Sequence, residues 1–391
     1  MSPTTAEYVR DLTGDLVAAL VELRRELHRH PELGFGEHRS TARVAAFLEA
    51  AGIETRLLSP TGLVAEIGPQ GEGRVLLRAD LDALPLQERS REPFSSEVPG
   101  ISHACGHDVH TAIAAGAARV LKELHDDGLL TRGVRVLFQP AEEVQPGGAR
   151  HVMDQGVLDG VARAFSLHCD PRLDVGRVGL KEGAITASSD TLRVTLSSLG
   201  GHTSRPHLTG DIVFALGQVI TQTGAVLNRR LDPRHGTSIT WGAVHAGNAA
   251  NVIPEEGVVY GTLRCLDSAV WEIAGPLAAQ AITQIVAPYE VDCDVEHVVG
   301  LPPVVNGEDE TVILREAARA ALGLEAAVPT EQSLGGEDFA WFLTRVPGAM
   351  ARLGTREPGG VTYDLHRGDA RFSEAAIPVG VRFLAMAALA G

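Results

Sequence analysis

The segment SHACGHDVH at residues 102–110 holds one thiol and three imidazoles within nine positions. Cys105 and His107 stand two apart across a glycine, which lets the backbone bend so that both side chains can face one point. Thiolate and imidazole ligands favour zinc, manganese, cobalt or nickel over magnesium and calcium. The segment therefore predicts a transition-metal site. A buried structural cysteine beside a helix-capping His–Asp pair is the alternative interpretation.

Two adjacent carboxylates, Glu142 and Glu143, follow an apolar run in QPAEEV (139–144). At a strand end, one such carboxylate can bind a metal while its neighbour faces the attacking water. A bound metal lowers the pKa of water to about 7, and a carboxylate base can then remove the proton. The alternative is a solvated loop or a helix N-terminus, where acidic side chains are also favoured.

Further candidate ligands are His168, which ends ARAFSLH, and His366 in DLHRGDARF. A single histidine at a strand end is more often a satisfied polar residue than a ligand. Four separate segments that each offer a thiol, an imidazole or a carboxylate make that interpretation weak for all of them together. Asp80 in RADLDALP is a candidate for the carboxylate that orients a metal-bound imidazole, with a strand-end cap as the alternative.

Candidates for substrate contacts lie later in the chain. Glycines precede His202 in GGHTSRPH, so its imidazole is exposed in a turn and could stabilise an oxyanion. Arg264 could bind a carboxylate through two parallel hydrogen bonds, and Asn251 lies in a nearby turn segment. The alternative interpretation of Arg264 is a cation on an edge strand, and that of Asn251 is an ordinary turn residue. Gly336 in GGEDFAWF has an amide that a ligand could approach closely.

These residues need a scaffold that brings strand ends together. Up to residue 185, strand-like runs at 73–80, 133–140 and 162–168 alternate with helix-like runs at 110–124 and 150–158. This alternation predicts an α/β fold with a mainly parallel sheet flanked by helices. Sheets of this type place their sites beyond the carboxyl ends of the strands, where the polar candidates lie.

From about residue 186 the pattern changes to β-α-β-β-α-β, which is typical of an inserted ferredoxin-like α+β domain. The predicted strands lie at 191–199, 237–247, 257–266 and 291–299, and the predicted helices lie at 211–227 and 269–286. We therefore expect a catalytic, metal-binding domain built from residues 1–185 and 301–391. The inserted domain would occupy residues 186–300.

Composition excludes some classes of partner. The 34 Lys and Arg residues against 50 Asp and Glu residues give a formal net charge of −16. This charge disfavours nucleic acid and anionic membranes but permits a small anionic substrate in a cleft. The N-terminal residues lack the pattern of a signal peptide, and no apolar run reaches the roughly 20 residues of a membrane span. With four scattered cysteines, a cytoplasmic protein without disulfides is expected.

Ten motifs in this order resemble the co-catalytic metallopeptidase/aminoacylase family, specifically its hippurate hydrolase and auxin-conjugate amidohydrolase branch. They run from about residue 24 to residue 372 and are RRELHRHPELGF, RADLDALP, HACGHDVHT, FQPAEE, GGARHVMDQGVLDG, GHTSRPH, GNAANVIP, GTLR, GGEDFAWF and LHRGDARF.

The resemblance implies a zinc-exopeptidase-like catalytic domain with two divalent metal ions (Zn, Mn, Co or Ni). It implies a shared ligand set in which the Cys105 thiolate bridges: Cys105, His107, Glu143, His168 and His366.

The resemblance also assigns the reacting groups. It implies that Glu142 is the general base and that Asn251 and Arg264 hold the substrate carboxylate. It further implies a homodimer formed through the inserted domain, in which His202 reaches the active site of the partner subunit.

Three segments depart from the branch pattern: HCDP follows the late-strand histidine, HRGDARFSE surrounds the C-terminal histidine, and Thr-Ser follows His202. The first two flank predicted ligands, so they bear on pocket shape and acyl specificity and leave the ligand set intact.

The expected activity is cleavage of the amide bond of N-acyl amino acids by metal-activated water. One alternative is a peptidase or carboxypeptidase acting on small dipeptides. Another is a thiol hydrolase with Cys105 as nucleophile and His107 or His110 as base. A binding protein that kept the cleft but lost turnover is the non-enzymatic alternative.

Overall fold

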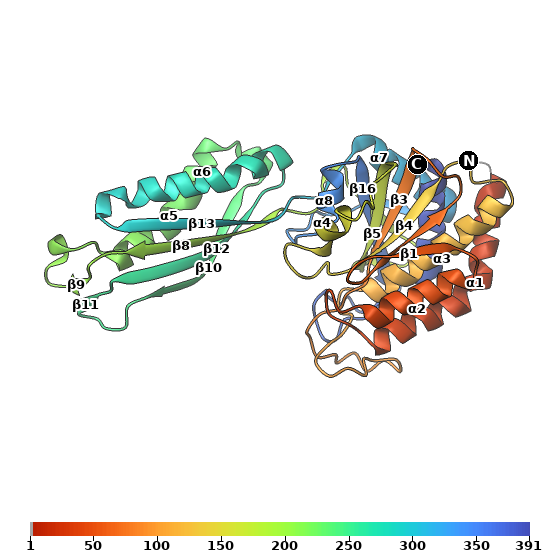
Figure 1. The fold of residues 1–391 in the computed structure, drawn as a ribbon, viewed down its shortest axis with the longest axis horizontal. Helices are drawn as coiled ribbons and strands as arrows, with labels where there is room; N and C mark the ends of the chain where they lie inside the picture. Colours follow the sequence, from red (N-terminus) through yellow and green to blue (C-terminus); the bar gives the residue numbers. More distant parts are fainter. Residues whose placement is uncertain (1–2) are drawn as a thin grey trace. The chain divides into compact units, whose positions relative to one another are not determined.

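The computed structural model describes residues 3–391 and divides the chain into two compact units (Figure 1). The larger unit runs to Ile185 and takes in Asn306–Gln332 and Asp338–Gly391. The smaller unit comprises Thr186–Val305 and Ser333–Glu337. It therefore extends five residues past the expected boundary at residue 300 and gains a short second segment. None of the described helices is long and apolar enough to cross a membrane.

The larger unit is built on one eight-stranded sheet within the described residues. Strands β3, β4, β5 and β16 form its parallel centre. Strand β2 runs antiparallel to β4 and β1 antiparallel to β2, whereas β6 runs antiparallel to β16 and parallel to β15. The sheet order is β1 (Glu54–Leu57), β2 (Leu63–Ile67), β4 (Val134–Gln139), β3 (Arg74–Asp80), β5 (Val161–Asp174), β16 (Gly348–Arg356), β6 (Val178–Leu180) and β15 (Ala327–Pro329). The mainly parallel α/β sheet predicted from strand–helix alternation is confirmed.

Helices cover this sheet and enclose the core. Helices α2, α3, α7 and α9 pack against strands, α1 packs against α3 and α9, and the short helices α4 and α8 contact each other. Their bounds are α1 (Pro3–Arg29), α2 (His38–Glu49), α3 (His107–Asp126), α4 (Gly148–Met153), α7 (Glu308–Leu322), α8 (Ala340–Leu343) and α9 (Ala376–Ala390). The helix predicted at 150–158 is shorter, because Gly156 adopts a left-handed conformation at φ 76° in the turn that follows.

The smaller unit has the ferredoxin-like order predicted from the sequence. Its strands form one antiparallel sheet in the order β10-β12-β8-β13, and helices α5 and α6 pack together against it (Figure 1). The elements are β8 (Ser189–Ser197), α5 (Ile212–Arg230), β10 (Ser238–Ala246), β12 (Glu256–Arg264), α6 (Ser268–Val286) and β13 (Asp292–Leu301). Two short strands, β9 (Gly201–His202) and β11 (Val252–Ile253), form a separate ribbon.

Helix α3 has few large side chains because it is buried on several sides. It contacts the sheet and also α1 and α9, and residues 107–118 are all buried. The closest approach is at Gly116, where an added Cβ would lie 2.6 Å from Val381 Cγ2 and 2.7 Å from Leu20 Cδ1. The alanines and glycine of this helix therefore allow three helices to meet at short distance.

This contact predicts opposite effects of the same substitution at two helical glycines. Ala is favoured over Gly in a helix by about 1 kcal/mol, so Gly14→Ala on the exposed face of α1, where a Cβ meets nothing within 4 Å, should raise the free energy of unfolding. Gly116→Ala should lower it by about 1–3 kcal/mol through overpacking. Urea unfolding of both variants measures the difference. Equal stabilisation by the two would contradict the close packing.

Candidate metal centre

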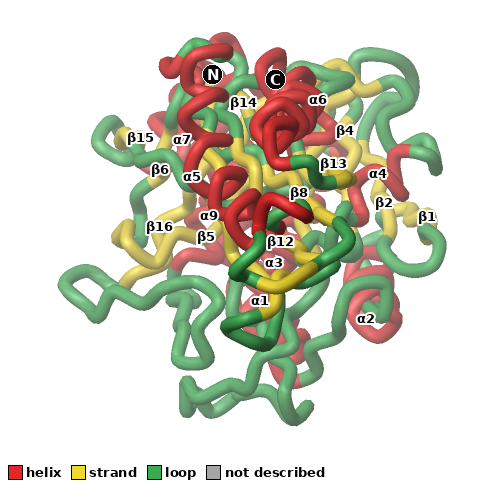
Figure 2. The backbone as a smooth tube through the Cα atoms, turned by 90° about the vertical axis from the view of Figure 1, so that its left-hand side faces the viewer, coloured by secondary structure: helices red, strands yellow, loops and turns green. Residues whose placement is uncertain are grey.

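The five predicted ligands come together in the larger unit and lie in four separate segments of the chain. His107 is the first residue of α3, and Cys105 lies two residues before it. Glu143 follows β4, His168 lies within β5, and His366 lies in the loop after β16. Because β3, β4, β5 and β16 are parallel neighbours, their carboxyl ends meet at one edge of the sheet. Residues 81–106 and 357–375, which contain Cys105 and His366, are largely loop, and loops are green in Figure 2.

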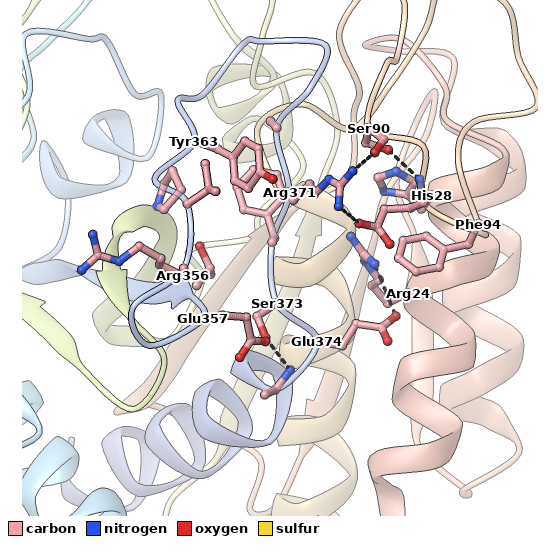
Figure 3. Close-up of a pocket in the computed structure, with 18 of the residues that line it drawn as sticks. Arg24, His28, Ser90, Phe94, Arg356, Glu357, Tyr363, Arg371, Ser373 and Glu374 are labelled. Carbon is pink, nitrogen blue, oxygen red and sulfur yellow. Dashed lines mark hydrogen bonds and ion pairs between the residues drawn. The ribbon is translucent and has the colours of Figure 1, made fainter.

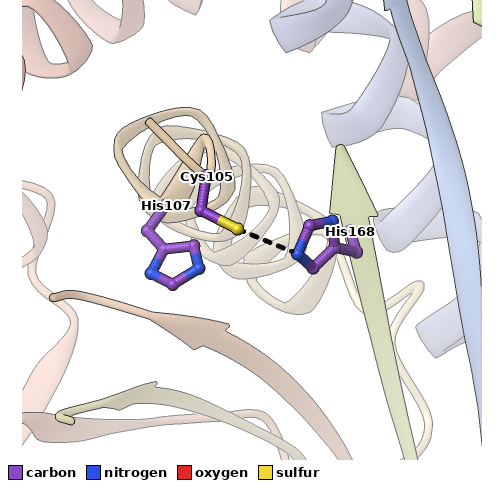
Figure 4. A group of neighbouring side chains, drawn as sticks. All are labelled: Cys105, His107 and His168. Carbon is purple, nitrogen blue, oxygen red and sulfur yellow. Dashed lines mark hydrogen bonds between the residues drawn. The ribbon is translucent and has the colours of Figure 1, made fainter. Parts of the chain in front are cut away.

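The donor atoms of these side chains have the spacing of a coordination shell. Cys105 Sγ lies 3.4 Å from His168 Nε2 (Figure 4), and Glu143 Oε1 lies 3.8 Å from His107 Nε2 and 3.3 Å from His366 Nε2. Ligand atoms bound tetrahedrally to one cation at 2.0–2.3 Å lie roughly 3.5 Å apart.

Cys105 belongs to two such groups. One group joins it to His107 and His168, and the other joins it to Glu143 and His366. The Cys105 sulfur is thus the donor that these two groups have in common.

The ring orientations of two histidines suit metal binding. Nδ1 of His107 lies 2.9 Å from the carbonyl oxygen of Asp82, and Nδ1 of His168 lies 2.8 Å from that of Cys169. A carbonyl only accepts, so in the neutral form of each ring Nδ1 carries the proton and Nε2 holds the lone pair. His107 Nε2 is buried and has no hydrogen-bond partner within residues 3–391. A buried ring nitrogen left without a partner fits a cation that the other donors also face.

Burial and neighbouring charges set the protonation of the donors. Burial raises the pKa of the Cys105 thiol and lowers the pKa of His168, which keeps that imidazole neutral. Burial also acts to raise the pKa of Glu143, but its hydrogen bond with His366 and the charge of His107 lower it overall. The thiol therefore needs a cation beside it to ionise, whereas the carboxylate is already ionised.

Asp80 occupies a different place from the one expected for it. Its Oδ1 accepts a hydrogen bond from His110 Nδ1 at 2.7 Å, and its Oδ2 pairs with Arg78. The predicted ligands His107 and His168 are oriented by main-chain carbonyls instead, which a sequence pattern does not reveal. His110 Nε2 in turn accepts the backbone N–H of Cys169 at 2.8 Å. Both ring nitrogens of His110 are thus already used, which excludes it as a free base.

Sequence reasoning missed the role of Asp82. Its Oδ1 accepts the backbone N–H of Glu142 at 3.0 Å, and its Oδ2 accepts that of Glu143 at 2.9 Å. With its carbonyl bonded to His107, this one residue fixes three of the candidate site residues. The signal was the second carboxylate of RADLDALP, but the sequence offers no means of ranking Asp80 and Asp82.

Three backbone positions at the site have unusual conformations. Ala141 and His366 are non-glycine residues in the left-handed region, each with φ 58°. Gly106, which caps α3, has φ 90°, and a Cβ there would lie 3.0 Å from Cys169 Sγ. Such strained positions cost free energy and are found chiefly where a site has to be shaped. Gly106 is required on both counts, which is the physical basis of the Cys-Gly-His spacing.

In the smaller unit, His202 lies on the short ribbon and Asn251 in the turn directly before its second strand. His202 on β9 pairs with Val252 on β11, the residue after Asn251. The backbone N–H of Ser204 donates to His202 Nδ1 at 3.1 Å, so a neutral His202 carries its proton on Nε2. The exposed imidazole can therefore act as a hydrogen-bond donor.

Within the smaller unit, Arg264 contacts the Ser333–Glu337 segment that carries Gly336, which the sequence did not predict. The Arg264 guanidinium donates to the carbonyl oxygen of Leu334 at 2.6 Å, and Gly336 lies against Leu301 and Ser189. Burial lowers the pKa of Arg264. The guanidinium thus holds the Ser333–Glu337 segment in this unit as well as being a candidate for binding a carboxylate.

A second feature of the larger unit is a pocket of about 520 Å³, with charged and apolar side chains in its lining, that none of the five predicted ligands lines (Figure 3). Arg24 crosses the face of Phe94 at 4.3 Å and pairs with the buried Asp108. His28 bonds to Asp108 and to Glu88; burial acts to raise the pKa of Glu88, but the bond from His28 helps to lower it to about 2. These contacts fix Asp108, which follows His107 in α3.

Known proteins are similar to this chain in sequence and in fold. The model of Peptidase family M20/M25/M40 matches residues 76–390. A putative glutamate–cysteine ligase 2-3 from Rhodococcus jostii (strain RHA1) is 48% identical over 93% of this chain, which spans only 46% of that protein. An N-acetyl-L-cysteine deacetylase from Bacillus subtilis (strain 168) is 38% identical, with 86% of this chain and 80% of the relative covered.

A solved structure shares both the fold and part of the sequence. It is that of the Bacillus subtilis YXEP protein, a dinuclear metal-binding peptidase of the M20 family. It is 34% identical with a TM-score of 0.83, and the match covers 96% of this chain and 98% of that one. The chain therefore belongs to Peptidase family M20/M25/M40, a family of hydrolytic enzymes.

Proposed function

We propose that this protein is a dinuclear-metal amidohydrolase that cleaves the amide bond of N-acyl amino acids. The observation that carries the proposal is the buried, unpartnered Nε2 of His107 among the donor atoms of Cys105, Glu143, His168 and His366 within the described residues. A relative that deacetylates N-acetyl-L-cysteine supports an N-acyl amino acid as the class of substrate.

The ligand set favours zinc, manganese, cobalt or nickel, because it combines a thiol and imidazoles with a single carboxylate. When bound, the two cations would supply a Lewis-acidic centre that lowers the pKa of water. Glu142 would accept the proton of the attacking water and return it to the departing amine nitrogen. Its backbone N–H is held by Asp82, and its Oε2 lies 4.0 Å from His107 Nε2, so the carboxylate lies beside the donor group.

The remaining predicted residues supply substrate contacts in this proposal. His202, with its proton on Nε2, would donate a hydrogen bond to the oxyanion that forms from the scissile carbonyl. Asn251, Arg264 and the amide of Gly336 would hold the carboxylate of the amino acid. The subunit that receives His202 would be the partner in a homodimer.

A thiol hydrolase built on Cys105 fits the site less well. Burial raises the pKa of the Cys105 thiol, whereas a nucleophilic cysteine needs a lowered one. His110 cannot serve as its base, because its ring nitrogens bond to Asp80 and to the backbone of Cys169. This alternative also leaves Glu143 and His366 without a role.

Replacement of the proposed base tests the mechanism. Glu142→Gln should lower kcat by about 10²–10⁴-fold, because the amide cannot accept the proton of water. Binding of two metal ions should persist, measured by elemental analysis of the purified variant. Glu72→Gln, an exposed position before β3 at the opposite end of that strand from the site, is the matched control and should keep full activity. Near-normal turnover by Glu142→Gln would remove the general-base role.

Metal removal distinguishes the metal mechanism from its rivals. Protein stripped by a chelator should lose hydrolysis of N-acetyl, N-benzoyl and indoleacyl amino acids, and regain it with Zn²⁺, Mn²⁺, Co²⁺ or Ni²⁺. Full activity in metal-free protein would favour the thiol hydrolase. Hydrolysis of dipeptides alone would favour the peptidase, and no hydrolysis with metal present would favour a binding protein.

Subunit mixing tests whether His202 acts across a dimer. Glu142→Gln and His202→Ala should each be nearly inactive as homodimers. A heterodimer of the two has one site with an intact Glu142 that receives an intact His202 from the partner, so unfolding and refolding the mixture should restore activity. If His202 served its own subunit, every site would lack one group and the mixture would stay inactive.

A further inference from the structure

The motif RRELHRHPELGF and the following Gly36 and Glu37 have no role in the mechanism above, yet they lie against the loop that carries Glu142. Glu37 immediately precedes α2 and is fully buried. Its Oε1 accepts the backbone N–H of Ala141 at 2.8 Å, and its Oε2 accepts the hydroxyl of Thr61 at 2.5 Å. A buried carboxylate far away in the sequence is thus bonded to the residue directly before the two catalytic-site glutamates.

The bond from Glu37 completes a row of three. The successive backbone N–H groups of Ala141, Glu142 and Glu143 are bonded to buried carboxylates, the first to Glu37 and the next two to Asp82. Ala141 itself has φ 58°, a conformation that a non-glycine residue keeps only when its surroundings hold it. The direction in which the two following side chains leave the loop depends on that residue.

The motif also contacts the loop by close packing. A Cβ at Gly34 would lie 3.2 Å from both Cα and Cβ of Ala141, so a larger residue there would require the two segments to move apart by a few tenths of an ångström. In the other direction, Leu33 forms a bridge with Ala83, whose N–H donates to the carbonyl of Glu32 at 2.8 Å. Residues 32–37 therefore contact both the chain next to Asp82 and the loop that Asp82 holds.

We propose that Glu37 is a positioning residue for the metal centre, because its carboxylate fixes the peptide of Ala141 and thereby aims Glu142 and Glu143. The inference rests on the proposed function for what these two residues do. In this inference, the PELGFGE segment holds the proposed base, Glu142, and the predicted ligand, Glu143, in position.

Three substitutions of Glu37 distinguish the effect of its hydrogen-bond acceptor from the effects of its volume and its charge. Glu37→Leu removes the acceptor at similar volume. Glu37→Asp keeps the charge but withdraws the carboxylate by one methylene, and it guards against a Leu variant that does not fold. Glu37→Gln keeps an oxygen for the Ala141 N–H and an amide that can donate to Thr61.

Thr41→Val is the matched control. Thr41 Oγ1 accepts the buried backbone N–H of Gly62 at 2.8 Å, so this variant also strips the acceptor from a buried N–H close by in the fold. It leaves the bond to Ala141 in place and should lower stability without changing the site.

The first readout is Mn²⁺ or Zn²⁺ affinity, measured by titrating metal-free protein, and it does not depend on turnover. Glu37→Leu should bind the metal about 10–100-fold more weakly, as is typical when a group that orients a ligand is lost. Its kcat, measured with saturating metal, should fall at least about tenfold, while KM changes by less than about threefold, because the base is misplaced and the substrate contacts are not. Glu37→Asp should show a smaller loss of both, and Glu37→Gln and Thr41→Val should stay within about threefold of the unaltered protein.

Metal affinity and kcat within twofold of the unaltered protein in folded Glu37→Leu or Glu37→Asp would overturn the proposal. So would a loss in Glu37→Gln as large as in Glu37→Leu, since the acceptor oxygen is still there. These outcomes differ from a failure of the proposed function, in which the unaltered protein itself would bind no metal or hydrolyse no N-acyl amino acid.

Discussion

The centre depends on hydrogen bonds that fix its donor side chains before any ligand arrives. Asp82 is the clearest case, because its two carboxylate oxygens hold the peptides of Glu142 and Glu143 while its carbonyl holds His107. Side chains locked in this way lose little further conformational entropy when a cation binds. The cost is paid during folding, by burying carboxylates and imidazoles that then require partners.

The sheet supplies the rigidity that such fixing requires. Four parallel strands end at one edge, so residues from segments far apart in the chain approach one another without long side chains. Where the backbone has to turn sharply there, it adopts left-handed conformations at Gly106, Ala141 and His366. Helix α3 packs against α1 and α9. Because His107 is the first residue of α3, this packing also fixes the position of His107.

The smaller unit contributes a different kind of site residue. His202 and Asn251 lie in or directly beside a two-stranded ribbon, and their exposed side chains are free of the core, unlike the buried donors of the larger unit. The contact of Arg264 with Leu334 attaches the Ser333–Glu337 segment to this unit, although the residues on both sides of it in the chain belong to the larger one. The candidate substrate contacts and the candidate metal ligands therefore lie in different compact units of one chain.

The sequence by itself determined the kinds of ligand, their order along the chain and the fold class. Residue type decides which cations a side chain can bind, and hydrophobic periodicity reports whether a segment is a strand or a helix. This is why the polar residues at the ends of the parallel strands, and the βαββαβ order of the smaller unit, were predictable.

Only the tertiary structure decided which atoms pair. Asp80 and Asp82 are equivalent as letters two positions apart, yet one orients His110 and the other the loop of Glu142. Main-chain carbonyls orient His107 and His168, and every residue carries such a carbonyl, so no pattern marks them. Glu37 reaches Ala141 across 104 positions. A hydrogen bond is decided by tenths of an ångström, and sequence separation says nothing about distances of that size in the folded chain.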